Sequence, residues 1–224
     1  MKIKLLLLMF TSIILSETLK YDVDFSGVKA GESTLSFKKE KKGKSVFYNL
    51  VSTTRTNKKF SKFVNFKEKI SITLDTLDYS IKKIQKQTAQ GKSRKSFRSV
   101  VRYDSKTDST TASSSNKTLK IAGKVHNPFG IVYYLRNQDI KLSDVFRFTT
   151  YDNDKKRDLE IIARRIEAIR VPHGTYECIV IEPVGKLSKG AIRIWLDTIT
   201  KIPIQIEVKN KVGTLKMMLK SIAS

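Results

Sequence analysis

The stretch Leu19-Lys20-Tyr21-Asp22-Val23-Asp24-Phe25 alternates apolar and polar side chains one by one. A period of two is typical of a β-strand with one buried face and one solvated face. The stretch therefore predicts a strand. The same alternation recurs at residues 33–37, 46–50, 70–74, 192–196 and 202–208.

Turn-forming residues lie between such strands, at residues 42–44 (Lys-Gly-Lys), 152–154 (Asp-Asn-Asp) and 173–174 (His-Gly). They are typical of hairpins, whose strands are antiparallel. A long antiparallel sheet with one polar face must curl on itself or pack against a second layer. We therefore predict a mostly β fold, in which an antiparallel barrel-like or spiral sheet carries one or two short helices.

The clearest helix prediction is residues 128–136. Asn127 is a favourable N-cap, and Pro128 suits the first helical position because its missing N–H is not needed there. The apolar and aromatic residues that follow recur at helical spacing. A helix of this kind is expected to pack across the open end or interior of the sheet.

Two other segments depart from the strand pattern. Residues 57–64 place aromatic and apolar side chains three and four apart, which predicts a short helix under a loop. Residues 107–120 are nearly all small and polar, which is consistent with either a flexible loop or an exposed hairpin.

The composition is that of one globular domain with a strong positive charge. The chain has 224 residues, of which 40% are hydrophobic and 29% charged. Its 44 Lys and Arg residues against 21 Asp and Glu residues give a net charge of +23. Such a charge attracts polyanions, including nucleic acids, anionic lipid headgroups and acidic polysaccharides.

The first residues narrow these partners by indicating export. Lys2 and Lys4 precede an apolar run that is short for a membrane span, and Ser16 is a small residue suited to cleavage. We therefore predict a signal peptide at residues 1–16 and a single β-rich periplasmic domain at residues 17–224. No cysteine lies near the cleavage site and no second long apolar segment follows. A soluble protein without a lipid anchor or transmembrane segment is expected, and nucleic acid is not expected as a partner.

Cys178 is the only cysteine, so the domain cannot close an internal disulfide. It lies in an apolar run and has no His, Lys or Arg beside it to stabilise a thiolate. We therefore interpret it as a small buried hydrophobic residue within a strand rather than a reactive thiol.

Common catalytic and cofactor motifs are absent from the sequence. The sequences at 43–45 and 91–93 end like phosphate-binding loops, but both lack the first glycine of that motif. His126 and His173 have no second ligand at metal-binding spacing, and no Gly-x-Ser-x-Gly elbow occurs. We therefore predict no enzymatic activity, no catalytic residues, no cofactor and no metal.

Three further features together resemble the exported bacterial family called domain of unknown function 3108. They are residues 21–31, with the turn Ala30-Gly31-Glu32; the helix ending Tyr133-Tyr134-Leu135-Arg136; and Ile194-Trp195-Leu196-Asp197 followed by Pro203. Residues 126–128 depart from the pattern, because an acidic residue is expected ahead of the proline. The resemblance implies an envelope location and a spiral or barrel-like sheet similar to folds that handle lipoproteins, and it implies no reaction.

Six residues are the candidate contacts to a ligand or an anionic surface. Trp195 and Arg136 belong to the resembling motifs, although a core position for Trp195 and a carboxylate pair or helix cap for Arg136 are the simpler readings. The others come from the basic series between residues 82 and 102. They are Arg94, Lys95, Arg98 and Arg102. Alternation along a strand would divide this series between two faces.

The sequence thus supports two functional hypotheses. The first is a non-enzymatic envelope protein that binds an amphiphile or an anionic component, such as an anionic lipid, a lipoprotein or a polysaccharide. The second is a structural or assembly partner of another envelope protein, which binds it through sheet edges or the basic face. An open apolar cavity on the concave side would favour the first, and a packed core the second.

The export prediction is tested by N-terminal sequencing of protein recovered from the cell envelope. A mature chain that begins near Glu17 is expected, because the charged start and the apolar run are followed there by a polar residue. Recovery of a chain that keeps Met1, in the cytoplasm, would contradict the prediction and make nucleic acid a candidate partner again.

Overall fold

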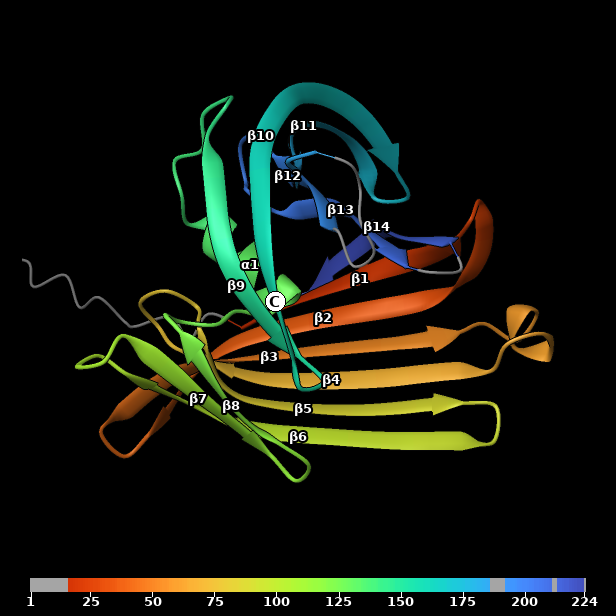
Figure 1. Cartoon of the computed structure of the whole chain (residues 1–224). Helices are drawn as coiled ribbons and strands as arrows, with labels where there is room; N and C mark the ends of the chain where they lie inside the picture. The colour runs from red at the N-terminus through yellow and green to blue at the C-terminus, as the bar shows by residue number, and fades with distance from the viewer. Residues whose placement is uncertain (1–15, 186–191, 211–212, 224) are drawn as a thin grey trace, which may run out of the picture.

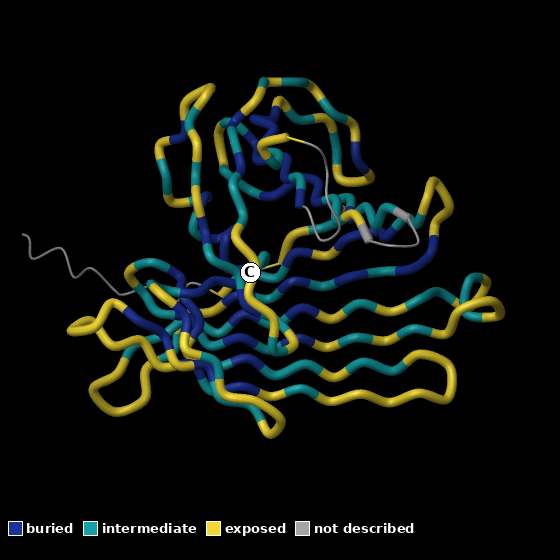
Figure 2. Tube along the Cα trace, in the orientation of Figure 1, coloured by how far each residue is buried: buried dark blue, intermediate teal, exposed yellow. Residues whose placement is uncertain are grey.

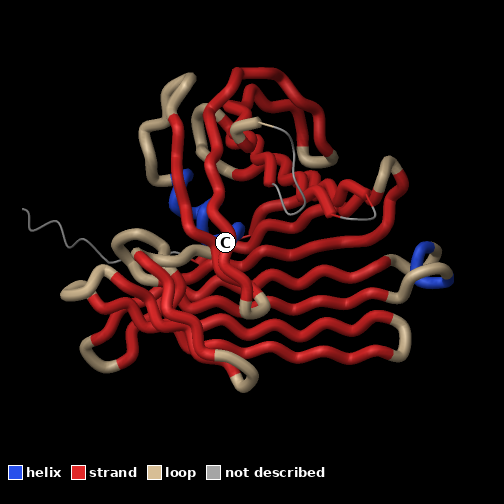
Figure 3. Tube along the Cα trace, viewed as in Figure 1, coloured by secondary structure: helices blue, strands red, loops and turns tan. Residues whose placement is uncertain are grey.

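The computed structural model describes residues 16–185, 192–210 and 213–223, and nearly all of them belong to one large antiparallel sheet (Figures 1 and 3). Its strands are β1 (Ser16–Phe25), β2 (Val28–Lys42), β3 (Ser45–Thr56), β4 (Phe66–Leu74), β5 (Ile81–Gln90), β6 (Ser93–Asp104), β7 (Ser109–Ser114), β8 (Thr118–Ala122), β9 (Val145–Asp152), β10 (Lys155–Val171), β11 (Gly174–Pro183), β12 (Ile192–Asp197), β13 (Pro203–Asn210) and β14 (Gly213–Ala223). A short 3₁₀ turn, η1 (Phe60–Lys62), and one helix, α1 (Pro128–Arg136), complete the described elements.

The strands follow one another as neighbours, in the order β8-β7-β6-β5-β4-β3-β2-β1-β14-β13-β12-β11-β10-β9. Each pair of neighbours is antiparallel, as expected for hairpins. The sheet is not closed, since β8 and β9 lie at its two edges. The prediction of a mostly β, antiparallel and barrel-like sheet with one or two short helices is confirmed.

The sheet folds over on itself, so that the β9–β10 hairpin lies across one face of β4–β6 (Figure 1). We call this covered face, which carries the core residues, the inner face and the opposite one the outer face. The Tyr151 hydroxyl donates to Ser99 Oγ at 3.0 Å, and Lys86 Nζ lies 3.4 Å from Asp152 Oδ2. These contacts hold the tip of the hairpin against β5 and β6.

Helix α1 has the bounds that the sequence predicts. Asn127 is extended at the N-cap, where its side-chain oxygen accepts a hydrogen bond from the Phe129 N–H at 3.0 Å. Pro128 takes the first helical turn, where its missing N–H costs nothing. The helix buries Ile131, Val132, Tyr133 and Leu135.

Helix α1 fills the space enclosed by the inner face. The Tyr133 ring stacks on Phe37 of β2, with centroids 4.0 Å apart. Arg136 donates to both carboxylate oxygens of Glu17 in β1, at 2.5 and 2.9 Å. Buried residues, drawn dark blue in Figure 2, concentrate where the two halves of the sheet meet. The concave side is therefore a packed core.

The segments that depart from the strand pattern in the sequence have the following structures. Residues 109–122 form the hairpin β7–β8 rather than a loop, but one face of it is buried rather than exposed, since Thr110, Ala112 and Ile121 lie in the core. Within residues 57–64 the helix is only the single turn η1. The proposed signal peptide lies outside the described residues, apart from Ser16, which begins β1.

Alternation does not predict β10, and a bulge explains why. Ala163 pairs with Ile181 but Arg165 pairs with Val180, so Arg164 is an extra residue. An extra residue shifts the phase of the alternation, because successive side chains point to opposite faces.

Cys178 is completely buried in β11, as the sequence predicts. Burial, with a smaller contribution from Asp197 on the neighbouring strand, raises the pKa of its thiol to about 12. The thiol is therefore protonated at neutral pH and shielded from solvent.

Cys178 should accordingly react slowly with a thiol reagent in the native protein and rapidly in denaturant. Cys178→Ser should lower the free energy of unfolding by about 1–3 kcal/mol, since it places a hydroxyl without an assured partner in an apolar site. Cys178→Ala is the matched control, because it abolishes labelling without adding a polar group. Fast labelling of the native protein would contradict the buried position.

Candidate functional site

The outer face of β3–β6 carries most of the long basic side chains of this part of the sheet. Leu50, Ile72, Ile84 and Val101 point to the core, so residues of the opposite parity lie on the outer face. On β3 to β6 the basic outer-face residues are Arg55, Lys67, Lys69, Lys83, Arg94, Arg98 and Arg102. Toward the β3–β4 turn these strands are exposed (Figure 2).

A groove of about 630 Å³ crosses these four strands. Its lining comprises three cross-strand rows, namely Arg55, Lys67, Ala89 and Arg94; Thr54, Glu68, Thr88 and Lys95; and Thr53, Lys69, Gln87 and Ser96. The first and third rows lie on the outer face. A groove on the inner face would also touch the adjoining inner-face residues Phe66, Ile70 and Phe97, none of which lines it. The groove therefore lies on the outer face, between two rows of side chains.

The charged side chains on the outer face of this groove are positive. Arg55 and Lys67 stand directly opposite each other on β3 and β4, and like charges in that position repel. Arg55 gains a partner in Glu32, whose Oε2 lies 3.3 Å from its Nη2. Arg94 donates only to the backbone carbonyls of Gly91 and Ser93, at 2.7 and 3.0 Å. No acidic residue occupies the outer face of β4 to β6 between residues 67–73, 83–89 and 94–102.

On the inner face of the same strands, the enclosed cation Lys86 is paired with carboxylates. Lys86 is half-buried between Glu68 and Asp152, at 3.2 and 3.4 Å. Burial lowers the pKa of Lys86, but Asp152 and Glu68 raise it by more, so that it stays above its ordinary value. Each inner cation that the fold encloses is thus neutralised, whereas the outer-face cations remain available to an external anion.

The residues that the sequence singles out do not share one site. Arg94, Arg98 and Arg102 all lie on the outer face of β6, whereas Lys95 has the parity of the inner face. The expected split of the basic series between two faces is therefore observed. Sequence reasoning also missed Arg55, Lys67 and Lys69. Only the register of the β3–β4 and β4–β5 hairpins shows that they share a face with the arginines of β6.

Arg136 and Trp195 lie elsewhere, and their side chains are engaged within the fold. Arg136 donates two hydrogen bonds to Glu17 on the inner side of the sheet. Trp195 of β12 is 4% exposed and donates its indole N–H to Glu167 Oε1 at 2.6 Å. Arg136 thus forms the carboxylate pair, and Trp195 has the core position, that the sequence offers as alternatives to ligand binding. Neither residue belongs to the groove.

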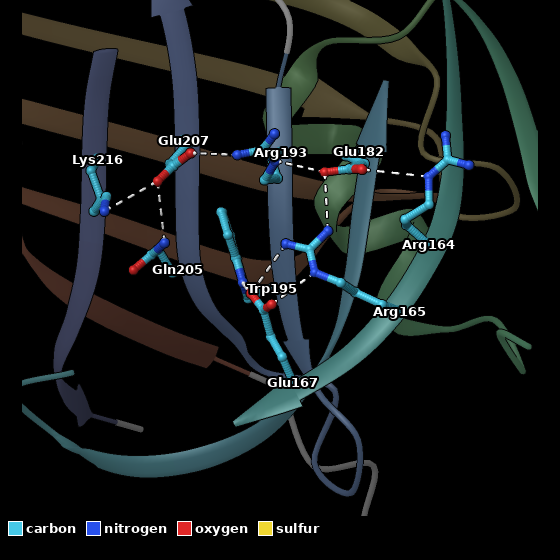
Figure 4. A network of polar contacts seen from close by, with 9 residues as sticks. All are labelled: Arg164, Arg165, Glu167, Glu182, Arg193, Trp195, Gln205, Glu207 and Lys216. Atoms are coloured by element: carbon cyan, nitrogen blue, oxygen red, sulfur yellow. Dashed lines mark hydrogen bonds and ion pairs between the residues drawn. The ribbon is translucent and has the colours of Figure 1, made fainter. Parts of the chain in front are cut away.

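Trp195 takes part in a second polar cluster, on β10 to β14 (Figure 4). Glu182 contacts Arg193 at 2.9 Å and Arg165 at 3.4 Å. Hydrogen bonds from Arg165 and then Trp195 lower the pKa of the Glu167 carboxyl. The remaining members are Arg164, Gln205, Glu207 and Lys216. Each carboxylate here already has a cationic partner within the fold, so we interpret the cluster as structural.

The described residues contain no group of three or more His, Cys, Asp and Glu side chains placed to hold a metal ion. None of the helices in the described ranges has the length and apolar character that a membrane crossing requires.

Comparison with known proteins identifies the family. The family model "Protein of unknown function (DUF3108)" matches residues 20–220. The chain belongs to this family. No curated protein matches this DUF3108 member.

Among solved structures, this DUF3108 chain is similar to the beta-barrel-like protein of domain of unknown function DUF1849 from Brucella abortus. The TM-score is 0.60 at 11% identity, and the match covers 93% of this chain and 97% of the other. At this identity the similarity concerns the fold.

Lys67→Glu should stabilise this DUF3108 protein, because it replaces a repulsive cross-strand pair with an attractive one opposite Arg55. An increase of about 0.5 kcal/mol in the free energy of unfolding is expected from urea denaturation. Lys67→Gln, which only removes the repulsion, should give a smaller increase. A destabilised Lys67→Glu protein would show that the two side chains do not face each other.

Proposed function

We propose that the protein is a non-enzymatic component of the bacterial cell envelope that binds an anionic envelope molecule along the outer face of β3–β6. The observation that carries the proposal is the set of outer-face cations that have no acidic neighbour on β4 to β6. A protein that needed these charges only for solubility could intersperse acids among them.

The spacing of the cations suits a polyanion. Residues two apart on one strand are separated by roughly 6.8 Å, and β4 and β6, which have β5 between them, by about 9.6 Å. Lys67 and Lys69 on β4, with Arg94 and Arg98 on β6, thus form a two-dimensional array beside the groove. Phosphate, carboxylate or sulfate groups repeated along a polymer or a surface could occupy such an array and relieve the Arg55–Lys67 repulsion.

An amphiphile held inside the sheet has less support. The concave side is filled by α1, whose Tyr133 stacks on Phe37 and whose Arg136 binds Glu17. A ligand there would have to displace packed side chains and separate a half-buried ion pair, which is energetically costly. We therefore place the ligand on the outer face.

The packed concave side removes the internal cavity expected of an amphiphile binder and, by that criterion, favours an assembly role. The two sheet edges, however, give little support to assembly by strand pairing. Edge strand β8 has five residues, with Lys120 near its centre, and short lysine-bearing edges resist pairing with another chain. At the other edge, His126 bridges to β9 at Thr150, since its N–H donates to Thr149 O at 2.8 Å and its carbonyl accepts from the Tyr151 N–H at 3.0 Å, so this part of the edge is not free to pair with another chain.

The envelope location rests on the signal-peptide pattern of residues 1–16 and on the exported proteins that the family motifs resemble. The absence of a reaction is inferred from the positions of the nucleophilic and basic groups. His126 and Cys178 are buried on different strands or loops, and His173 lies in the β10–β11 turn with Tyr176 as its neighbour.

Binding of sulfated and phosphorylated polyanions tests this proposal. The mature protein should be retained on immobilised heparin and should co-sediment with vesicles that contain phosphatidylglycerol, and salt should release it from both. The fourfold variant Lys67→Gln, Lys69→Gln, Arg94→Gln, Arg98→Gln should elute from heparin at clearly lower salt, because it removes the array beside the groove.

A charge-matched control separates this array from net charge. Lys39, Lys41, Lys42 and Lys44 are exposed around the β2–β3 turn, at the opposite end of the strands. Changing these four to Gln lowers the net charge equally and should leave most of the retention intact. Equal losses in the two variants would show that binding follows net charge alone and would overturn the proposal.

A further inference from the structure

The β3–β4 turn, residues 57–65, exposes apolar side chains at the end of the basic outer face. Phe63 is 85% exposed and Val64 is 38% exposed. Burying a phenylalanine side chain stabilises a protein or a complex by roughly 1.5–3 kcal/mol. The exposed Phe63 does not contribute this free energy to the fold, and a binding partner could gain it. We call residues 58–64 the apolar tip.

The apolar tip is firmly attached to the sheet. The Asn57 side chain accepts from the Phe60 N–H at 2.8 Å and donates to the Lys29 carbonyl at 2.9 Å. The Phe60 ring contacts Phe25 of β1 edge-on, with centroids 6.4 Å apart. Phe60 is thus the anchor of the turn, and the same structure directs Phe63 away from the protein.

Lysines surround the exposed phenylalanine. Lys58, Lys59 and Lys62 are exposed, and none has an ion pair within the described part of the chain. The Gly91 N–H donates to Asn65 O at 2.9 Å, which joins this turn to the β5–β6 turn and its Lys92. No acidic residue occurs between residues 41 and 67. The tip therefore presents an apolar centre within a positive rim.

The rim continues into the groove. Lys67 follows the turn on β4, and Arg94 lies two strands away in the same cross-strand row. In Figure 1 the β3–β4 and β5–β6 turns lie together at one end of the sheet. The apolar tip and the outermost row of the groove thus adjoin at the same end of the sheet, and we treat them as one surface.

We propose that this surface docks on an anionic lipid bilayer, with Phe63 and Val64 inserted among the headgroups and the lysines in contact with lipid phosphates. The inference rests on the proposed function and names its anionic molecule as a lipid surface. A bilayer interface offers both halves of the required chemistry, because it buries an aromatic ring at headgroup depth and attracts each nearby lysine. A soluble polyanion would satisfy the lysines and leave Phe63 in water.

The chain contains a matched apolar side chain in a different setting. Leu77, in the β4–β5 turn at the other end of β4, is 87% exposed. Its neighbours are Asp75, which accepts from the Leu77 N–H at 2.9 Å, and Asp78. Asp75 pairs with Lys82 and Asp78 with Lys124, so the lysines near Leu77 are already neutralised. Leu77 therefore lacks the positive rim that surrounds Phe63 and should stay in water even though it is as exposed.

Fluorescence of Phe63→Trp and Leu77→Trp tests the insertion directly. The native Trp195 is 4% exposed and contributes the same background to both variants. Vesicles of phosphatidylcholine and phosphatidylglycerol in equal parts should shift the emission of Phe63→Trp to shorter wavelength, and brominated lipid should quench it. Leu77→Trp should show neither effect. Identical responses of the two variants, or no response from Phe63→Trp bound to vesicles, would overturn the inference.

Vesicle affinity supplies a second measurement. Phe63→Ser should weaken binding to these vesicles by about tenfold, as expected for loss of one buried aromatic side chain, whereas Leu77→Ser should bind like the unmodified protein. Neither change should alter the salt at which heparin releases the protein. Unchanged vesicle affinity of Phe63→Ser would contradict docking through the tip.

The two proposals can fail separately. Retention on heparin that depends on the outer-face array, without binding to the mixed vesicles, would leave the proposed function in place and refute the lipid surface. If the protein binds neither heparin nor the mixed vesicles, the proposed function itself is refuted. Equal binding to pure phosphatidylcholine vesicles would refute the role of the lysines, since a neutral surface offers them no net negative charge.

Discussion

A single-layer sheet must bury one of its faces, and here it does so by folding over α1. The stack of Tyr133 on Phe37 and the paired hydrogen bonds from Arg136 to Glu17 join the helix to β1 and β2. Because the concave side is filled in this way, charged groups can enter it only as neutralised pairs, as Lys86 does. On β4 to β6 most of the cations that lack an acidic neighbour therefore lie on the outer face, where an external anion can reach them.

The features that could be predicted from the sequence are those governed by neighbouring residues. Asn127 and Pro128 define the start of α1 because capping depends only on the first turn of a helix. Alternation at residues 19–25 likewise predicts β1. Alternation does not predict β10, because the extra residue Arg164 reverses the phase of the alternation partway along the strand. Bulges of this kind depend on the partner strand, which the sequence of one strand does not reveal.

The candidate site was predicted in part for the same reason. Arg94, Arg98 and Arg102 occur at every fourth position of one strand, so their common face follows from the strand period alone. Assigning Arg55 and Lys67 to that face requires the register across the β3–β4 turn, and this is set by the fold of a nine-residue turn around Asn57 and Phe60. The apolar spacing at residues 57–64 correctly marks a special segment, but only the structure separates the anchoring Phe60 from the exposed Phe63.

The pairing of β1 with β14 has a consequence for how the protein is made. Thr18 to Phe25 hydrogen-bond along Leu215 to Ala223, so the middle of the sheet joins the two ends of the described chain. Of the described strands, β1 is synthesised before all the others and its partner β14 after all of them. Hairpins such as β2–β3 can form as they emerge, whereas the central ladder cannot. The central ladder can therefore form only once β14 is available, and until then the described chain lacks its full core.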